Sequence, residues 1–258
     1  MEALNLESKG RPVRIGFLVP PGNPTVEVEM IALSAAMRPP EVSVHFTRMV
    51  AHGAAGSHQG QEERNRSQIA HLSENVALLA MVAPKVIVLA HTATSYTLGK
   101  KGEAELVARM QRETGIPFIT AFGSVLAAFA HLNVKRIAFG TPYDADATAK
   151  GKASLEAHGI EVVSVGRLES VKNIYEETAE RARGLARRID VPQAQAVFLS
   201  GVGMPTIATL ERMERDLGKP AVSAAAAMMW NALRLAGVAA PIPGFGRLLL
   251  EERGSPRK

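Results

Sequence analysis

The 258-residue sequence contains no cysteine. This absence excludes disulfide bonds, thiolate metal sites and any reaction that depends on a cysteine side chain of this chain. Aromatic residues are also scarce, at 5% of the chain, so aliphatic side chains must fill most of the interior. Because 47% of the residues are hydrophobic, the chain can still build one large core or two smaller cores that share an interface.

Long apolar runs and basic clusters are missing as well. No apolar run reaches the roughly 18 residues of a membrane-spanning helix, and residues 1–12 lack the apolar segment of a signal peptide. Lys and Arg outnumber Asp and Glu by 30 to 25, but no basic run alternates with aromatic residues. We therefore expect a cytoplasmic protein with no membrane or nucleic-acid partner. The small positive excess suits an anionic small molecule.

Motifs for metals and nucleotide cofactors are absent too. The His, Asp and Glu residues show none of the spacings typical of metal sites, such as HExxH. Residues 140–142 and residues 201–203 contain glycine, but each segment lacks the third glycine of a dinucleotide-binding loop. We therefore expect neither a metal nor an organic cofactor.

What the sequence does contain is an alternation of strands and helices. The apolar runs Val13–Val19, Val86–Leu89 and Ala196–Leu199 predict strands buried on both faces. Further strands are expected at residues 41–50, 117–120, 136–140, 160–165 and 221–223, and helices at residues 26–37, 62–81, 103–114, 124–132, 150–158, 174–189, 207–217 and 224–236. Such alternation is typical of parallel sheets covered by helices on both faces.

The order of elements repeats in the second half of the chain. The strand predicted at residues 136–140 resembles Val13–Val19, and a proline-containing loop follows each of them. We therefore predict an α/β fold with two pseudo-repeated Rossmann-like lobes, each with a parallel sheet, and a cleft between the lobes. The N-terminal lobe is expected at residues 13–120 with a C-terminal helix at 224–250, the C-terminal lobe at 121–223, and tails at 1–12 and 251–258.

The strand Val86–Leu89 ends in a group of small polar side chains that includes His91, Thr92 and Ser95. Open α/β sheets place their ligands at such carboxyl ends of strands. An imidazole can move a proton near neutral pH, and hydroxyl groups can stabilise a carboxylate or an enolate. The alternatives are a histidine that only bonds to a loop carbonyl and hydroxyls that only form a turn or a helix cap. Thr94 is expected to face away.

The corresponding loop of the second half follows Ala196–Leu199. Gly201, Val202 and Gly203 could present backbone N–H groups to an anion at the start of the next helix, although any tight strand-to-helix turn also favours glycine. Val202 and Met204 would make this side of the site apolar, which suits a substrate with a hydrophobic substituent.

Three more side chains are candidates for binding a substrate. Asn23 lies in the loop after the first strand and either binds a substrate or caps the next helix. Tyr143 either donates its phenol to a substrate or covers the turn at Pro142. Asn173 either binds a substrate or is an ordinary loop residue.

Several segments, taken in order, resemble a known family. The segments are residues 16–20 with 23–25, residues 141–143 with 156–160, residues 199–200 with 217–220, residues 230–231 with 235–237, and residues 244–249. Together they are similar to the branch of the aspartate/glutamate racemase superfamily that contains maleate cis–trans isomerases and arylmalonate decarboxylases. The resemblance covers about residues 13–250.

This resemblance implies a small carboxylate bound between two lobes without a cofactor. Hydroxyls and backbone N–H groups then hold a developing enolate, and the family's substrate ligands match Asn23, Thr92, Tyr143 and Asn173. The resemblance also implies two facing cysteines, one per lobe, and a homo-oligomer. The two cysteine positions fall on His91 and Gly201, so a cysteine-dependent mechanism is excluded for this chain.

We therefore predict a cofactor-independent, decarboxylase-like lyase that acts on a small malonate- or maleate-type carboxylic acid through a stabilised enolate. His91, in place of the cysteine, and Tyr143 are the predicted catalytic residues. Loss of carbon dioxide needs only one proton donor, which suits a single imidazole. Three alternatives remain: an isomerase or racemase of a small dicarboxylate, a hydrolase of a small amide, ester or lactone in which His91 activates water or Ser95, and a carboxylate-binding protein without activity.

Overall fold

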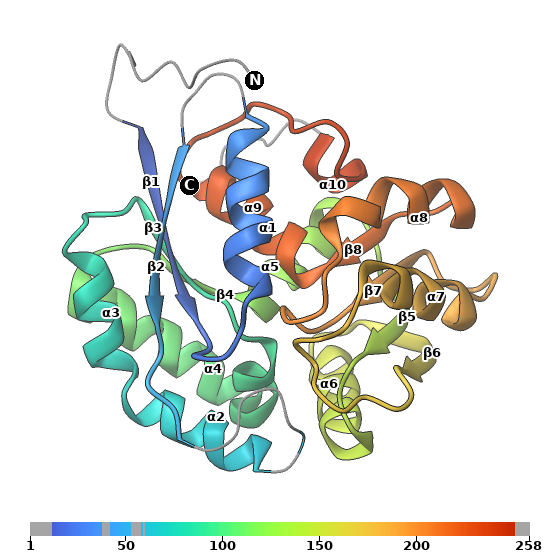
Figure 1. Ribbon diagram of the computed structural model, residues 1–258, viewed down its shortest axis with the longest axis horizontal. Helices are drawn as coiled ribbons and strands as arrows, with labels where there is room; N and C mark the ends of the chain where they lie inside the picture. The colour runs from blue at the N-terminus through green and yellow to red at the C-terminus, as the bar shows by residue number, and fades with distance from the viewer. Residues whose placement is uncertain (1–11, 38–41, 53–57, 59, 251–258) are drawn as a thin grey trace.

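Eight parallel strands form two separate sheets in the computed structural model, which describes residues 12–37, 42–52, 58 and 60–250 (Figure 1). The first sheet has the order β2-β1-β3-β4 and the second has the order β6-β5-β7-β8. The strands are β1 (Val13–Val19), β2 (Val42–Arg48), β3 (Val86–Leu89), β4 (Phe118–Thr120), β5 (Arg136–Thr141), β6 (Glu161–Arg167), β7 (Ala196–Leu199) and β8 (Ala221–Ser223). The same order in both sheets confirms the predicted α/β fold with an internal repeat.

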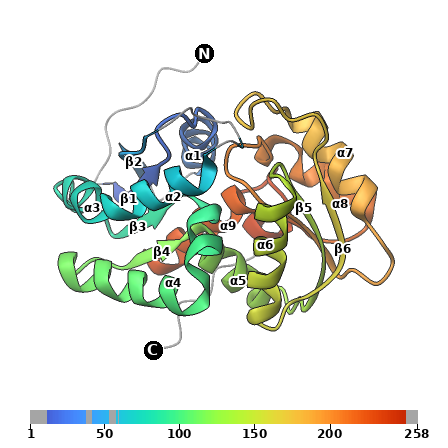
Figure 2. The same cartoon turned by 90° about the horizontal axis from the view of Figure 1, so that it is seen from below.

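Helices cover both faces of each sheet, as alternation of strands and helices requires (Figures 1 and 2). The helices are α1 (Thr25–Ala35), α2 (Gln61–Ala70), α3 (Leu72–Ala80), α4 (Thr92–Thr114), α5 (Ala121–His131), α6 (Ala145–Ala157), α7 (Ala179–Ile189), α8 (Leu210–Leu217), α9 (Ala224–Leu235) and α10 (Arg247–Leu250), with a 3₁₀ turn, η1, at Ile207–Thr209. Among the described residues, no helix combines the length and the apolar character that crossing a membrane requires.

The strand β3 shows why the central strands read as continuous apolar runs. Val86 and Val88 face the large core between the sheets, whereas Ile87 and Leu89 face a second core under α3 and α4. Side chains alternate between the faces of a strand, so a strand covered on both sides must be apolar at every position.

The helices α5 and α9 pack against each other between the two sheets (Figure 2). Every residue of α9 from Ala224 to Leu233 is buried, as expected for a helix that is apolar all round. Because α9 contacts both β3 and β8, it belongs to the interface as much as to one lobe. The predicted assignment of residues 224–250 to the N-terminal lobe stays a prediction. The predicted tails lie outside the described residues except for Pro12.

Two helices differ from the predictions in ways that affect the site. The helix expected at 103–114 begins eleven residues earlier, at Thr92. Gly99, which takes a left-handed φ of 67°, divides this helix into two helical parts. The helix expected at 62–81 is divided at His71 into α2 and α3. The cap predicted at Ser124 is also wrong, since the Thr120 side chain accepts the bond from the Gly123 N–H.

Polar contacts join the two halves of the chain near the carboxyl ends of the strands. Glu29 on α1 accepts hydrogen bonds through Oε1 from the backbone N–H groups of Thr206 (2.5 Å) and Ile207 (2.9 Å). Its other oxygen, Oε2, is buried and has no hydrogen-bond partner within the described part of the chain. Burial raises the pKa of this carboxyl from 4.5 to about 7, and the two N–H groups oppose the rise only partly.

We expect the Glu29→Gln variant to be more stable than the wild type at pH 8 by about 1–3 kcal/mol and equally stable at about pH 4. Because the pKa of Glu29 is higher in the folded than in the unfolded protein, the folded state binds the proton more tightly, and the free energy of unfolding falls as the pH rises from 4.5 to about 7. Glutamine keeps the accepting oxygen and carries no charge. Urea unfolding at both pH values measures the difference.

Glu27→Gln is the matched control, since Glu27 lies on the same helix and forms an ion pair with Arg48 on the surface. Identical pH dependence of stability in the wild type and the Glu29→Gln variant would contradict the prediction.

Candidate active site

His91 lies between β3 and α4, in extended backbone with φ −154° and ψ 102°. Its Nδ1 is 2.8 Å from the hydroxyl of Thr94, so Nε2 is the nitrogen left to meet a ligand. Thr94 therefore does not face away as predicted but holds the imidazole. Burial and, to a smaller extent, the positive charge of Arg64 together lower the pKa of His91 from 6.5 to about 4. At neutral pH the imidazole is thus uncharged, with one nitrogen able to accept a proton.

Thr92 and Tyr143 come together from opposite halves of the chain. The hydroxyl Oγ1 of Thr92, the first residue of α4, lies 2.9 Å from the phenol oxygen of Tyr143, which follows β5. Both side chains are buried, and burial raises the pKa of Tyr143 to about 12, against the effect of the bond to Thr92. Tyr143 is therefore an uncharged phenol and a hydrogen-bond donor at neutral pH.

Two further hydroxyls extend this contact. Ser200 Oγ lies 3.5 Å from Thr92 Oγ1, and Tyr96 OH lies 2.8 Å from Ser200 Oγ. Neither Ser200 nor Tyr96 was among the candidate residues. The repeat offered a signal for Ser200, since it directly follows β7 just as the opening of the His91 loop follows β3.

The side chain of Asn23 holds the start of the next helix, which is one of the two roles considered for it, and its substrate-binding role stays a prediction. Its Oδ1 accepts hydrogen bonds from the N–H groups of Thr25 (2.8 Å) and Val26 (3.1 Å) and so holds the first turn of α1. Its Nδ2 is buried and has no hydrogen-bond partner among the described residues. This nitrogen is a donor that a ligand can use.

The loop after β7 is shaped by glycine. Gly201 has a φ of +94°, and a Cβ there would lie 2.9 Å from the Pro142 ring and 3.4 Å from the Tyr143 hydroxyl. A Cβ on Gly203 would lie 2.7 Å from the ring of Tyr175. Only glycine allows this loop to approach so closely.

Val202 and Met204, which were expected to form an apolar wall, are both buried beside these glycines. Thr25 donates to the Gly203 carbonyl at 2.9 Å, which ties the loop to the start of α1. The loop therefore contacts the segment that carries Asn23.

We expect Gly201→Ala to destabilise the protein by about 2–4 kcal/mol, since a side chain there must adopt a left-handed φ and also displace the Pro142 ring. Gly184→Ala is the control, because a Cβ on Gly184 in α7 meets no atom within 4 Å. That change should stabilise the helix by about 0.5–1 kcal/mol. Thermal and urea unfolding measure both, and equal stability of the two variants would contradict the prediction.

The structure gives Ser95 and Asn173 other partners than a substrate. The hydroxyl of Ser95 donates to the buried carboxylate of Glu103 at 2.7 Å. The side chain of Asn173 accepts from the Tyr175 N–H at 3.0 Å and lies 3.4 Å from Glu176. Sequence position brought both residues into the predicted site, but local hydrogen bonds use the Ser95 hydroxyl and hold Asn173 in its own loop. Their substrate-binding roles stay predictions.

Arg64 on α2 is a charged residue that sequence reasoning missed. Its side chain is buried, and its charge lowers the pKa of His91 and opposes the burial that raises the pKa of Tyr175. The guanidinium therefore brings a positive charge to the side of the site where His91 lies. Arg64 stands in the strongly charged run of residues 61–66, which resembles the exposed face of a helix, so the sequence held no signal for it.

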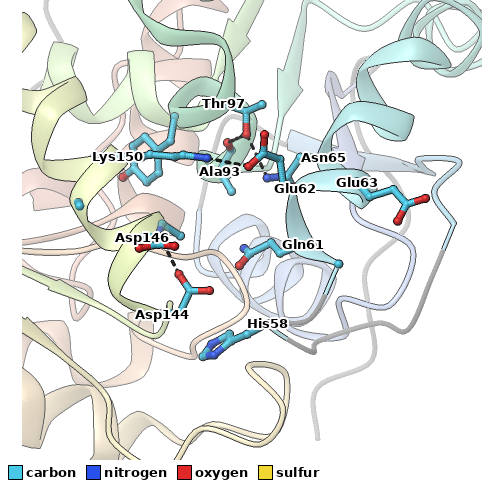
Figure 3. A pocket seen from close by; sticks show the side chains of 14 residues that line it. His58, Gln61, Glu62, Glu63, Asn65, Ala93, Thr97, Asp144, Asp146 and Lys150 are labelled. Atoms are coloured by element: carbon cyan, nitrogen blue, oxygen red, sulfur yellow. Dashed lines mark hydrogen bonds and ion pairs between the residues drawn. The ribbon is translucent and has the colours of Figure 1, made fainter.

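A cavity of about 470 Å³ opens between the two halves, between α2 and α6, and its back wall includes Ala93 and Thr97 of α4 (Figure 3). An ion pair of 2.8 Å between Lys150 and Glu62 spans it. A second cavity of about 520 Å³ is lined by Tyr143. His58 lines both cavities, with Nε2 3.0 Å from the Pro142 carbonyl.

Tyr96 lines the first cavity and Tyr143 lines the second. Over the described ranges, no group of three His, Asp or Glu side chains is arranged to hold a metal ion.

Known proteins share this architecture. A model of the arylmalonate decarboxylase family matches residues 15–249. The chain is 32% identical over 248 residues to a maleate isomerase of Nocardia farcinica, covering 93% of this chain and 96% of the relative. It is 31% identical over 173 residues to an arylmalonate decarboxylase of Bordetella bronchiseptica, covering 64% of this chain and 71% of the relative.

A solved structure adds a chemical detail. The maleate cis–trans isomerase of Nocardia farcinica, in a cysteine-to-serine variant with a covalently bound succinylcysteine intermediate, aligns with a TM-score of 0.84 at 29% identity. The alignment covers 93% of this chain and 99% of that one. These similarities confirm the resemblance inferred from the sequence segments.

Proposed function

Because the chain belongs to the arylmalonate decarboxylase family, we propose that it is a cofactor-independent enzyme that converts a small malonate- or maleate-type dicarboxylic acid through a stabilised enolate. The observation that carries the proposal is the pair of hydroxyls, Thr92 and Tyr143, that meet from opposite halves beside an uncharged His91. This pair supplies the donors, and the imidazole supplies the group that reacts with the substrate carbon.

The hydroxyl pair suits an oxygen that becomes negative during the reaction. Thr92 and Tyr143 have two hydroxyl hydrogens, and their mutual bond uses only one of them. The other hydrogen is available to a carboxylate oxygen of the substrate, and Asn23 Nδ2 offers a further donor. Donors fixed in a buried site stabilise developing charge without having to reorganise.

The protonation state of His91 decides between the reactions. An uncharged imidazole accepts a proton from a carbon next to a carboxylate, or adds through Nε2 to a carbon–carbon double bond. In either case the electron pair moves onto the carboxylate to give the enolate. After addition, the enolate rotates about the carbon–carbon bond and the returning pair expels the imidazole, which releases the isomer. After proton removal, the isomer forms when a proton is delivered to the opposite face of the enolate. Decarboxylation instead needs an acid that protonates the carbon after carbon dioxide has left. With a pKa of about 4, His91 suits the first role.

Arg64 supports the same choice. A guanidinium binds a carboxylate with two parallel hydrogen bonds, so a substrate with two carboxylates places one at Thr92 and Tyr143 and the other toward Arg64. A carboxylate held by a guanidinium is stabilised before it can leave, which slows decarboxylation. We therefore place isomerisation of a small dicarboxylate first. Decarboxylation, which the sequence analysis favoured, is the second candidate because the matching family model is that of arylmalonate decarboxylases.

The test is turnover by the purified protein of maleate, of single enantiomers of 2-substituted succinates, and of 2-substituted malonates, followed by NMR. We expect formation of fumarate or loss of optical purity, without release of carbon dioxide. Release of carbon dioxide from a malonate would instead establish the second candidate. A folded protein that converts none of these acids would contradict the proposed function.

A further inference from the structure

The mechanism above uses Thr92 and Tyr143 but leaves two buried hydroxyls beside them without a role. Ser200 Oγ lies 3.5 Å from Thr92 Oγ1, and Tyr96 OH lies 2.8 Å from Ser200 Oγ. Both side chains are buried, and Tyr96 carries no charge at neutral pH because burial raises its pKa. The four hydroxyls form a continuous row in which residues of the first half alternate with residues of the second.

The number of hydroxyl hydrogens determines which hydroxyl donates to which along this row. A hydroxyl has one hydrogen and two lone pairs, and Ser200 is placed to donate to Thr92. The bond between Tyr96 and Ser200 must then be donated by Tyr96. Since Thr92 receives a hydrogen bond from Ser200, its own hydrogen is directed away from Ser200, toward the Tyr143 side where the substrate oxygen is placed. Hydrogen bonds in such a row polarise one another and strengthen the last donor.

We propose that Ser200 and Tyr96 are positioning residues that orient and polarise the Thr92 hydroxyl toward the oxyanion of the substrate. This inference rests on the proposed function, because it assigns the two residues a part in the same site. The 3.5 Å separation between Ser200 and Thr92 is the longest in the row.

The packing of Tyr96 fits a specific placement of its hydroxyl. The ring lies edge-on to Phe122, with centroids 5.3 Å apart, and a Cβ on Gly151 of α6 would lie 3.0 Å from it. The absence of a side chain at Gly151 therefore admits the ring to the interface between α4 and α6. From there its hydroxyl reaches Ser200 on the far half. The orientation of the Tyr96 hydroxyl therefore depends on how closely the two halves of the chain approach each other.

The test compares Tyr96→Phe and Ser200→Ala with the wild type on the acid that the wild type converts best. Each change deletes one oxygen and keeps the packing. We expect Tyr96→Phe to lower kcat about 10-fold, and Ser200→Ala by at least as much, with KM within about twofold, as for the loss of one neutral hydrogen bond in the transition state. The double variant should be no slower than Ser200→Ala, since both changes interrupt one row.

Thr114→Val is the matched control, because this hydroxyl lies at the far end of the same helix, α4, and donates to the Met110 carbonyl at 2.9 Å. Its kcat should equal that of the wild type. Wild-type kcat in Tyr96→Phe, a change confined to KM, or multiplying effects in the double variant would overturn the inference while leaving the proposed function intact. A wild type that neither converts nor binds maleate and malonate in calorimetry would overturn the proposed function and the positioning role with it.

Discussion

Replacing His91 by asparagine is expected to lower kcat by about 10²–10⁴-fold, the range that a positioned acid or base contributes. Asparagine places a polar atom where Nδ1 lies, so it can keep the contact with Thr94, but it has no atom in the place of Nε2. The change therefore removes the reactive nitrogen and little else. Steady-state kinetics on the acid identified in the turnover screen measures the effect.

The pH dependence of the wild type gives the same prediction a second readout. Because the pKa of His91 is about 4, we expect kcat/KM to be constant from about pH 5.5 to pH 8 and to fall only at lower pH. An unburied histidine would lose activity below about pH 6.5. A loss of activity centred near pH 6.5 would contradict a lowered pKa of the titrating base.

His45→Asn is the control for this prediction. His45 lies on β2 of the same sheet, where its Nε2 is 3.0 Å from the Ser43 hydroxyl. Its replacement should leave kcat and the pH profile as in the wild type. Full activity of the His91→Asn variant would contradict a catalytic role of His91 and would show that this histidine has only a structural role.

The second large effect is expected for Tyr143→Phe, which should lower kcat by about 10²–10³-fold, as removal of one oxyanion donor does in other enzymes. Phenylalanine retains the buried ring and loses only the hydroxyl that meets Thr92. Thr92→Val should have a similar effect. The double variant should be only slightly slower than either, because the two hydroxyls act on one oxygen.

This experiment separates the two interpretations of Tyr143 that the sequence left open. If the side chain only covers the turn at Pro142, Tyr143→Phe retains full activity and full stability. If it donates to the substrate, the variant is folded, with a melting temperature near that of the wild type, but slow. Kinetics and thermal unfolding on the same samples therefore distinguish a covering ring from a donor.

The strands were predictable because their burial requires a hydrophobic pattern that is visible in the sequence. A strand such as β3 is buried on both faces, so every position is apolar and the run is unmistakable. The sequence patterns at the starts of helices were weaker. The hydroxyl-rich start of α4 at Thr92 was interpreted as a loop, and Gly99, with its left-handed φ, separated it from the rest of the helix.

The residues of the site also differ in how far the sequence predicts them. His91, Thr92 and Tyr143 lie beside strand ends, where topology alone predicts ligands, so sequence reasoning could find them. Arg64 and Tyr96 reach the site through the packing of α2, α4 and α6, which no local pattern encodes. Ser95 also follows a strand end, but its position did not predict that its hydroxyl donates to the Glu103 carboxylate.

The backbone at Gly201 limits which side chains the site can hold, as well as affecting the stability of the protein. The family places a cysteine at this position and another at the position of His91. A thiol could replace the imidazole of His91 without any change in the extended backbone there. At Gly201 the φ of +94° and the adjoining Pro142 ring exclude a side chain until the loop itself is rebuilt. A site with two thiols is thus opposed by the conformation of one loop, and no single substitution in this chain creates it.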